Sequence, residues 1–204
     1  LNIMEVPVFE LKVNNDLKSD LVVDYVAGVD VPAIQDNFFA FSAEKNPFEF
    51  AQVEDEHRII FGAAMIPNQL ILRKHPKTGE PFKVFYTKET IEILAHKFFA
   101  NGYQNNFNLM HDEKQRKDGV TFFQSVIKDT SKGIIGIKGD HPDGTWFLGA
   151  KVTNDEVWNE VKLGNIKGFS IEGMFNQVPV SEPMLTAEEA HKMIEHILNR
   201  TQLN

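Results

Sequence analysis

Short runs of β-branched and aromatic residues recur along most of the chain, several of them alternating with polar residues, and this pattern predicts strands. The runs are separated by segments rich in proline, glycine and charge, which predict turns and loops. Residues 43–56, which are highly charged and contain Pro47, form one such predicted surface loop. The predicted strands cover residues 6–13, 21–26, 57–65, 69–73, 82–86, 107–111, 120–128, 134–138, 145–152 and 166–176.

Helical spacing of apolar residues begins after Thr87, a residue type that favours the N-cap position. Apolar side chains then recur at i, i+3, i+4 and i+7 and form one stripe. These residues are Ile91, Leu94, Ala95 and Phe98. Gly102 has the residue type expected just beyond a helix C-terminus. The sequence therefore predicts a helix from Thr87 to about Ala100.

Two further helices are predicted. Thr153 and Glu156 have the spacing of a capping box and open a short helix that ends before Gly164. A last amphipathic helix begins at Thr186. We therefore expect one domain over residues 1–180, followed by a C-terminal amphipathic helix within residues 181–204.

The order of these elements predicts the fold class. Many short strands with a few helices between them favour a mixed β/α fold, a β-barrel or sandwich surrounded by helices, over a doubly wound parallel sheet. The glycine-rich phosphate loops of nucleotide enzymes, G-x-G-x-x-G and G-x-x-x-x-G-K-[ST], do not occur in the sequence. Their absence removes the main support for those enzyme classes.

The composition narrows the function classes further. With 204 residues, of which 42% are hydrophobic and 25% charged, the chain can form a folded domain. No apolar run approaches the roughly 18 residues of a membrane-spanning helix. The sequence has no cysteine, which excludes disulfides, zinc–thiolate sites and cysteine nucleophiles. A formal net charge of -8 at pH 7 disfavours binding to nucleic acid.

Ser170 differs from the other serines because it lies in a strand-like run between Gly168 and Gly173. The small neighbours leave room for a substrate carbonyl to approach the hydroxyl, as a nucleophilic serine requires. The alternative is a structural serine in a strand where the glycines mark a bulge or a bend.

His111 lies at the end of a predicted strand, where it would share a face with Phe107 and Leu109. Such a histidine is either a core residue with its own hydrogen bonds or a general base held against a nucleophile from another strand. Periodicity alone does not bring His111 and Ser170 together, so both interpretations stay open.

A histidine cluster on the last predicted helix resembles an inverted zinc-protease motif, H-x-x-E-H, but has one residue too many between its histidines. It consists of His191, Glu195 and His196. Five residues at about 100° each place the two rings roughly 140° apart on a helix, so they cannot share one metal ion. We therefore expect no metal site, and a metal-dependent hydrolase is disfavoured.

Five segments, in this order and at plausible spacing, resemble the XkdF-type serine proteases of tailed phages, a branch of the prohead (capsid-maturation) proteases. They are residues 58–68, 85–91, 101–106, 109–112 and 168–173, the last two reading LMHD and GFSIEG. Residues 26–33 also resemble the family's N-terminal strand and turn. The resemblance covers most of residues 20–177.

The resemblance implies an assemblin-like fold, in which a bent β-barrel is surrounded by a few α-helices and carries a serine nucleophile and a histidine base. The family's histidine matches His111 and its serine matches Ser170. We take Glu172 as the third catalytic residue because it lies two residues from Ser170 and thus on the same strand face. The alternative for Glu172 is an ion pair with a lysine such as Lys167. Asp112 is a poorer choice, since neighbours on a strand point to opposite faces.

We therefore expect a serine endopeptidase of phage head maturation that needs no metal or organic cofactor. Its substrates would be phage scaffold and major capsid proteins, and the protease itself, inside the assembling prohead in the host cytoplasm. The alternative is a structural or scaffold-associated head protein on the same fold, with little or no hydrolysis. Because assemblins are activated by dimerisation, the C-terminal helix either forms a homodimer contact or covers the barrel.

Overall fold

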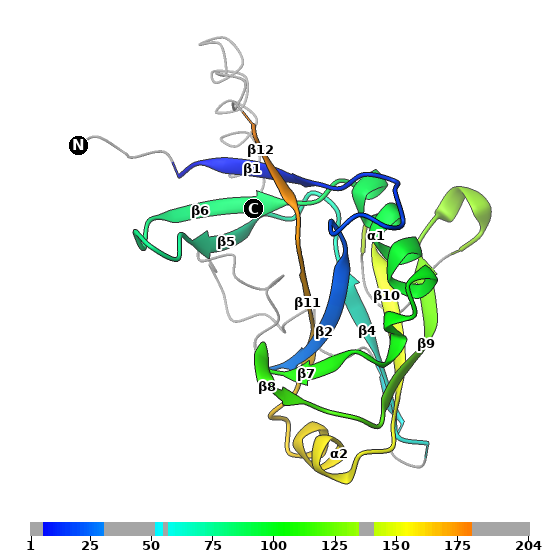
Figure 1. The fold of residues 1–204 in the computed structure, drawn as a ribbon. Helices are drawn as coiled ribbons and strands as arrows, with labels where there is room; N and C mark the ends of the chain where they lie inside the picture. Colours follow the sequence, from blue (N-terminus) through cyan, green and yellow to red (C-terminus); the bar gives the residue numbers. More distant parts are fainter. Residues whose placement is uncertain (1–5, 31–51, 55–56, 135–140, 181–204) are drawn as a thin grey trace, which may run out of the picture.

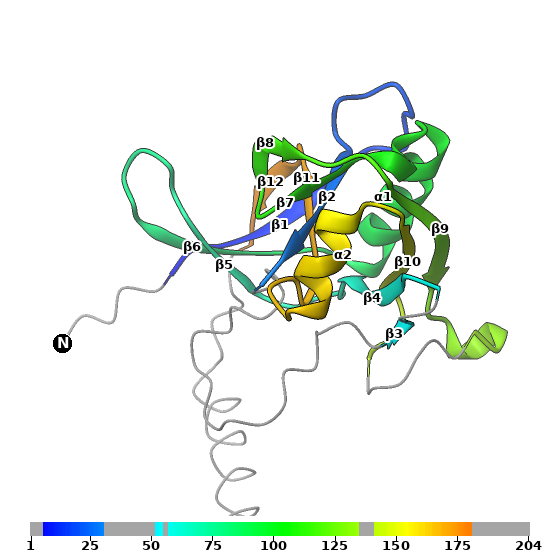
Figure 2. The ribbon, with the colours of Figure 1, turned by 90° about the horizontal axis from the view of Figure 1, so that it is seen from below.

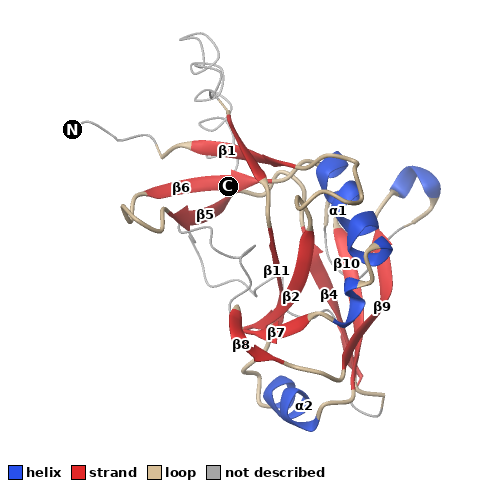
Figure 3. Cartoon of the chain, viewed as in Figure 1, coloured by secondary structure: helices blue, strands red, loops and turns tan. Residues whose placement is uncertain are grey.

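The computed structural model describes residues 6–30, 52–54, 57–134 and 141–180. Within these ranges the chain forms twelve strands, two α-helices and two short 3-10 helices (Figure 1; Figure 3 shows them by type). The strands are β1 (Val8–Lys12), β2 (Val23–Val29), β3 (Gln52–Glu54), β4 (Ile59–Met65), β5 (Ile71–Lys74), β6 (Pro81–Phe85), β7 (Phe107–Leu109), β8 (Asp112–Arg116), β9 (Val120–Ile127), β10 (Trp146–Val152), β11 (Gly168–Gly173) and β12 (Asn176–Pro179). The helices are α1 (Lys88–Ala100), α2 (Asp155–Lys162), η2 (Tyr103–Asn105) and η3 (Thr130–Lys132).

The strands form three four-stranded sheets. Their orders are β12-β1-β6-β5, β3-β4-β10-β9 and β11-β2-β7-β8, and we call them the first, second and third sheet. Figure 1 shows β11 running on into β12, so one stretch of chain connects the third sheet to the first. Seen from below in Figure 2, the β5–β6 hairpin of the first sheet projects away from the other two sheets.

This arrangement confirms the mixed class of the fold and corrects the expected closed barrel. Within the described residues the three sheets are open, and no ladder joins one to the next. The strands β4 and β11 lie against each other, but β4 pairs with β3 and β10 while β11 pairs with β2.

The strand predicted over residues 166–176 divides into β11 and β12 because the backbone bends at Gly173. A Cβ at Gly173 would lie 2.1 Å from the carbonyl oxygen of Val22, so glycine is required where β11 and β2 come this close. The pairing of the two strands shifts register between Glu172 and Gly173. The chain then leaves the third sheet, and β12 pairs with β1 in the first.

An aromatic cluster joins the second and third sheets and helix α1. Phe122 of β9 contacts the rings of Phe98, Phe107 and Phe169 at centroid distances of 6.0, 6.3 and 5.5 Å. All four rings are buried. Removing each of them from water stabilises the fold by about 1.5–3 kcal/mol, so this cluster fixes the positions of β7 and β11 relative to β9.

Helix α1 forms as its sequence predicts. The Thr87 hydroxyl accepts a hydrogen bond from the Thr90 backbone amide, and the predicted apolar stripe is buried. Beyond the helix, Gly102 has a φ of 76°, a left-handed conformation that glycine adopts without strain. The expected beginning and end of this helix are therefore confirmed.

Helix α2 lies where it was predicted, but its N-cap is Asn154 and not Thr153. The Asn154 side chain accepts a hydrogen bond from the Val157 amide at 3.0 Å. The Thr153 hydroxyl donates to the carbonyl oxygen of Gly119 at 3.1 Å, and the cap comes one residue later, from Asn154.

Three other expectations differ from the structure or lie outside it. Strand β3 lies within the segment predicted as a loop, where it pairs with β4, and β8 was not predicted at all. Of the strand expected over 134–138, only Ile134 is described, and it forms an isolated bridge with Asp129. The predicted C-terminal helix within 181–204 lies outside the described residues.

A buried lysine ties helix α1 to the connection between β1 and β2. Lys97 is fully buried, and its ammonium group donates to the Ser19 hydroxyl at 2.7 Å and to the carbonyl oxygen of Leu21 at 2.7 Å. The carbonyl oxygen of Asn14 lies 3.4 Å away as a third acceptor. Burial lowers the pKa of Lys97 from its ordinary value.

Replacing Lys97 with methionine keeps the apolar stem but removes all three hydrogen bonds. We expect Lys97→Met to lower the free energy of unfolding by about 2–3 kcal/mol, because three part-buried hydrogen bonds from a charged donor are lost. Urea denaturation at pH 7 measures this difference. Lys162→Met, at an exposed position of α2, is the matched control and should change stability by no more than about 0.5 kcal/mol. Equal midpoints for the two variants would contradict the tethering role of Lys97.

Candidate active site

Strand β11 carries Ser170 on the face opposite the aromatic cluster. Side chains alternate along a strand, and since Phe169 packs against Phe122, Ser170 and Glu172 point the other way. Ser170 is 3% exposed, and its Oγ has no hydrogen-bond partner among the described residues. A buried hydroxyl in this state costs about 1–3 kcal/mol. Such a group calls for a functional explanation.

The pairing of three strands places Asn108 on the same face as Ser170. Ser170 of β11 lies opposite Ala27 of β2, and Ala27 lies opposite Asn108 of β7. Residues directly opposite one another across a sheet point to the same face. Asn108 is 1% exposed. Only the methyl group of Ala27 stands between Ser170 and Asn108 along this row.

His111 lies in the two-residue turn between β7 and β8, not on a strand. Met110 and His111 have φ values of 54° and 59°, both in the left-handed region that glycine and asparagine favour. Pairing of Leu109 with Asp112 closes the hairpin around them. The expectation that His111 continues the strand and shares the face of Phe107 and Leu109 is therefore wrong.

The turn brings His111 to Glu172. The Nδ1 atom of His111 lies 2.9 Å from Oε1 of Glu172, and the same oxygen accepts a hydrogen bond from Nδ2 of Asn108 at 2.7 Å. The pairing of Glu172 with Lys167, the structural alternative, is replaced by this contact with His111. Asp112 lies in β8, where its carboxylate accepts from the Lys114 amide.

This contact determines which nitrogen of the histidine remains for chemistry. A carboxylate only accepts hydrogen bonds, so Nδ1 of His111 carries the hydrogen that points to Glu172. In the neutral ring Nε2 is then the basic nitrogen, as in a histidine that takes a proton from a serine. The structure thus brings together two of the three predicted site residues, His111 and Glu172. The third, Ser170, lies on the same face without a hydrogen bond to His111.

His111 and Glu172 border a groove of about 760 Å³ between the first and third sheets. One wall comes from the first sheet and is largely apolar, and the other comes from β2, the His111 turn and the end of β11. The lining residues used below are Asp24, Arg73, Tyr86, Ile171 and Glu172. A groove of this volume is large enough to hold several side chains of a peptide.

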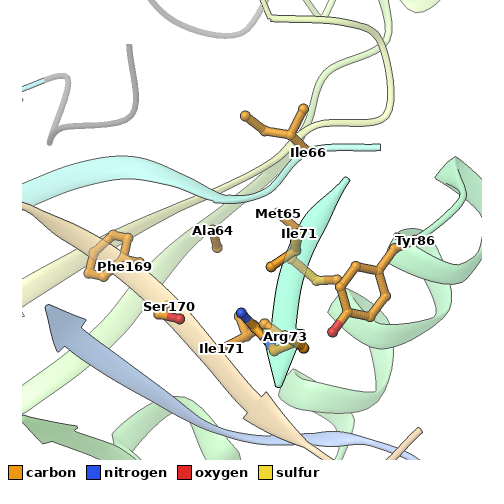
Figure 4. A pocket seen from close by; sticks show the side chains of 9 residues that line it. All are labelled: Ala64, Met65, Ile66, Ile71, Arg73, Tyr86, Phe169, Ser170 and Ile171. Carbon is orange, nitrogen blue, oxygen red and sulfur yellow. The ribbon is translucent and has the colours of Figure 1, made fainter. Parts of the chain in front are cut away.

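Ser170 lines a separate, much smaller cavity next to the groove. This cavity has a volume of about 10 Å³, close to the smallest space that holds one water molecule. Figure 4 shows Ser170 facing it from β11 while Ile71 and Arg73 enter from β5. Arg73, Tyr86 and Ile171 line both the cavity and the groove. These three side chains are therefore the boundary between the candidate nucleophile and the open groove.

Burial changes the ionisation of two groups in the groove. Desolvation raises the pKa of the Tyr86 phenol above its ordinary value, so Tyr86 is neutral and acts as a hydrogen-bonding or apolar wall. Desolvation also raises the pKa of the Asp24 carboxyl, and the negative charge of Glu172 raises it further. The groove therefore contains two carboxylates that repel each other, of which Glu172 has the histidine partner.

Among the described residues there is no group of three or more histidine, cysteine, aspartate or glutamate side chains that could hold a metal ion. The cluster of His191, Glu195 and His196 lies outside them. No helix of the described part of the chain is long and apolar enough to cross a membrane.

Sequence reasoning missed Asn108 and Arg73. Asn108 stands between two core residues, Phe107 and Leu109, and so alternation alone places it on the opposite face of β7. A buried polar residue at such a position was a signal that could have been used. Arg73 has no comparable signal, because its place beside Ser170 depends on packing between strands of different sheets.

Comparison with known proteins identifies related chains. Residues 48–178 match the sequence model of a family described as "Putative phage serine protease XkdF". Two proteins of Bacillus subtilis (strain 168) are similar. The "Phage-like element PBSX protein XkdF" is 29% identical over 170 residues, which cover 78% of this chain and 56% of that protein. The "Uncharacterized protein YqbD" is 27% identical over 173 residues, which cover 82% of this chain and 49% of that protein.

The chain thus spans about half the length of the curated relatives it matches. No solved structure matches it.

The raised pKa of Asp24 makes the stability of the folded chain depend on pH. Because its pKa is raised in the folded state, folding holds the Asp24 proton more tightly than the unfolded chain does. Stability is therefore lost as the pH rises from the ordinary value of 3.8 through the raised pKa. We expect Asp24→Asn to melt at a higher temperature than the wild type at pH 7, with the difference shrinking towards pH 4.

Thermal unfolding of both proteins between pH 4 and pH 7 measures this difference. Asp20→Asn, at an exposed position of the connection that precedes β2, is the control and should leave the difference near zero at every pH. A melting temperature of Asp24→Asn below that of the wild type at pH 7 would contradict the argument.

Proposed function

The chain belongs to the XkdF family of phage proteins, and on this premise we propose that it is a serine endopeptidase of phage head maturation. The observation that carries the proposal is the His111–Glu172 contact of 2.9 Å, at the edge of a groove and on the strand face that also carries Ser170. A serine, a histidine and a carboxylate on one face are the groups that acyl transfer requires.

In the proposed mechanism Ser170 attacks the peptide carbonyl while Nε2 of His111 takes the proton of its hydroxyl. Glu172 accepts the Nδ1 hydrogen of His111 and stabilises the imidazolium that forms. The imidazolium then gives its proton to the leaving amine as the carbon–nitrogen bond breaks, which leaves an acyl-enzyme. A water molecule gives a proton to His111, attacks the acyl group and releases the new carboxylate, and Ser170 regains its proton.

This mechanism requires Ser170 and His111 to approach each other when substrate binds. Hydrogen bonds between catalytic groups are often long in the free enzyme and shorten only in the substrate complex. The small side chain of Ala27, which lies opposite Ser170 of β11 and opposite Asn108 of β7, leaves space beside Ser170 for this approach. Movement of Arg73 or Ile171 would connect the cavity of Ser170 to the groove.

We propose that the substrates are phage scaffold and major capsid proteins and the protease itself, cleaved inside the assembling prohead in the host cytoplasm. The net charge of -8 supports binding to basic scaffold or capsid segments through electrostatic complementarity. No metal or organic cofactor enters the mechanism.

One observation favours a second candidate, a structural or scaffold-associated head protein without hydrolysis. The Oγ atom of Ser170 is buried and makes no hydrogen bond to His111. A chain that had lost activity would keep the fold and need not keep the nucleophile accessible.

Co-expression with the scaffold and major capsid proteins of the same phage separates the two candidates. We expect the wild-type full-length protein to yield cleaved products, and Ser170→Ala to reduce the cleavage rate by on the order of a thousandfold or more. Intact-mass spectrometry identifies the products and their cleavage sites.

Ser131→Ala is the matched control, because the Ser131 hydroxyl contacts Asp129 and lines neither the cavity nor the groove. It should cleave at the wild-type rate. Cleavage by Ser170→Ala at that rate would exclude Ser170 as the nucleophile. Assembly of normal heads without any cleavage would favour the structural protein.

A further inference from the structure

The carboxylate that contacts His111 has a second partner, which is far less exposed than the histidine. The Nδ2 atom of Asn108 donates to Oε1 of Glu172 at 2.7 Å, and the Nδ1 atom of His111 lies 2.9 Å from the same oxygen. Asn108 is 1% exposed, whereas the side chains of Glu172 and His111 are 26% and 41% exposed. The three residues thus form a chain from the buried strand β7 to the open groove.

We infer that Asn108 is a positioning residue, which holds the Glu172 carboxylate in the orientation that accepts the Nδ1 hydrogen of His111. The catalytic meaning of this role rests on the proposed function. The hydrogen-bonded arrangement itself is a property of the folded chain and is measurable whether or not the protein cleaves peptides.

Exposure explains why Glu172 needs such a partner. A glutamate side chain that is one quarter exposed has several rotamers within reach, and ordering it costs side-chain entropy. Asp24 in the same groove repels the Glu172 carboxylate and so cannot hold it. Asn108 is fixed by its own strand, because β7 pairs with β2 on one side and β8 on the other.

The turn that carries His111 fixes the backbone of this residue but not the direction of its ring. A non-glycine residue with a positive φ occupies a sparsely populated conformation, and Met110 and His111 both do so in succession. The turn is anchored by a hydrogen bond from the Met110 amide to the carbonyl oxygen of Gly28 at 3.1 Å. Backbone pairing thus fixes the Cα of His111, while the direction of its exposed ring depends on Glu172.

The chemistry of the Asn108 amide suits this positioning role. A side-chain NH₂ group donates without carrying charge, so Asn108 orients the carboxylate but leaves its negative charge available to the imidazolium. A lysine or arginine there would neutralise Glu172 and weaken its effect on His111.

The test uses the tautomer of His111, measured from the 15N chemical shifts of its ring by NMR at a pH where the ring is neutral. In the wild-type full-length protein we expect the Nδ1-protonated form to dominate. In Asn108→Ala and Asn108→Leu we expect its share to fall to a minority, because the Nε2-protonated form is intrinsically preferred once Glu172 is no longer held. The leucine variant keeps most of the side-chain volume in case the alanine variant fails to fold.

Asn106→Ala is the matched control. The side chain of Asn106 also donates a part-buried hydrogen bond, to the carbonyl oxygen of Asp24 at 2.8 Å, but does not contact Glu172. We expect this variant to lose stability while His111 keeps the wild-type tautomer. If peptide cleavage is observed, the Asn108 variants should lower kcat by about tenfold or more with little change in KM.

Two results would overturn the inference. One is a wild-type tautomer of His111 in a folded Asn108 variant. The other is an equal shift in Asn106→Ala, which would mean that the loss of any side-chain amide hydrogen bond in this region disturbs the site. Neither depends on proteolysis, so a failure of this inference is distinguishable from a failure of the proposed function. If the tautomer shifts as expected and no substrate is cleaved, the positioning role stands and the activity does not.

Discussion

The contact of Phe122 with three other buried rings is the constraint on which the rest of the structure depends. It clamps α1, β7 and β11 against β9. Because side chains alternate along a strand, fixing Phe107 and Phe169 in the core also fixes the next residue of each strand on the opposite face. Those next residues are Asn108 and Ser170. The polar face of the third sheet is thus held in place by the apolar core behind it, and the two faces cannot vary independently.

The sequence predicted those elements whose determining interactions lie within one short segment of the chain, and it did not predict those that depend on contacts between distant segments. Helix α1 was predicted to within a residue, because its cap, its apolar stripe and Gly102 all lie within one short segment. The shared face of Ser170 and Glu172 also followed from alternation along one strand. The division into three open sheets could not be predicted, since it depends on which distant strands pair, and the bend at Gly173 depends on the approach of Val22.

The candidate site was predicted only in part, for the same reason. The sequence singled out His111 as a candidate general base but placed it on a strand, because Met and His are not residues that mark a left-handed turn. Asn108 was passed over since a single polar residue in a three-residue strand has no distinctive spacing. The positions of His111 and Asn108 next to Glu172 follow only from the fold, in which β2 lies between β7 and β11. Residue type therefore suggested the chemistry, and the fold supplied its geometry.

The β7–β8 hairpin limits how the chain can change over evolutionary time. With only two residues between Leu109 and Asp112, one inserted residue would alter both the turn type and the direction of the His111 ring. The guanidinium of Arg116 lies 4.6 Å from the ring of Tyr25, so a contact across β7 also links the far end of β8 to β2. Most surface loops tolerate changes of length, but this one should keep a constant length among relatives that retain the histidine.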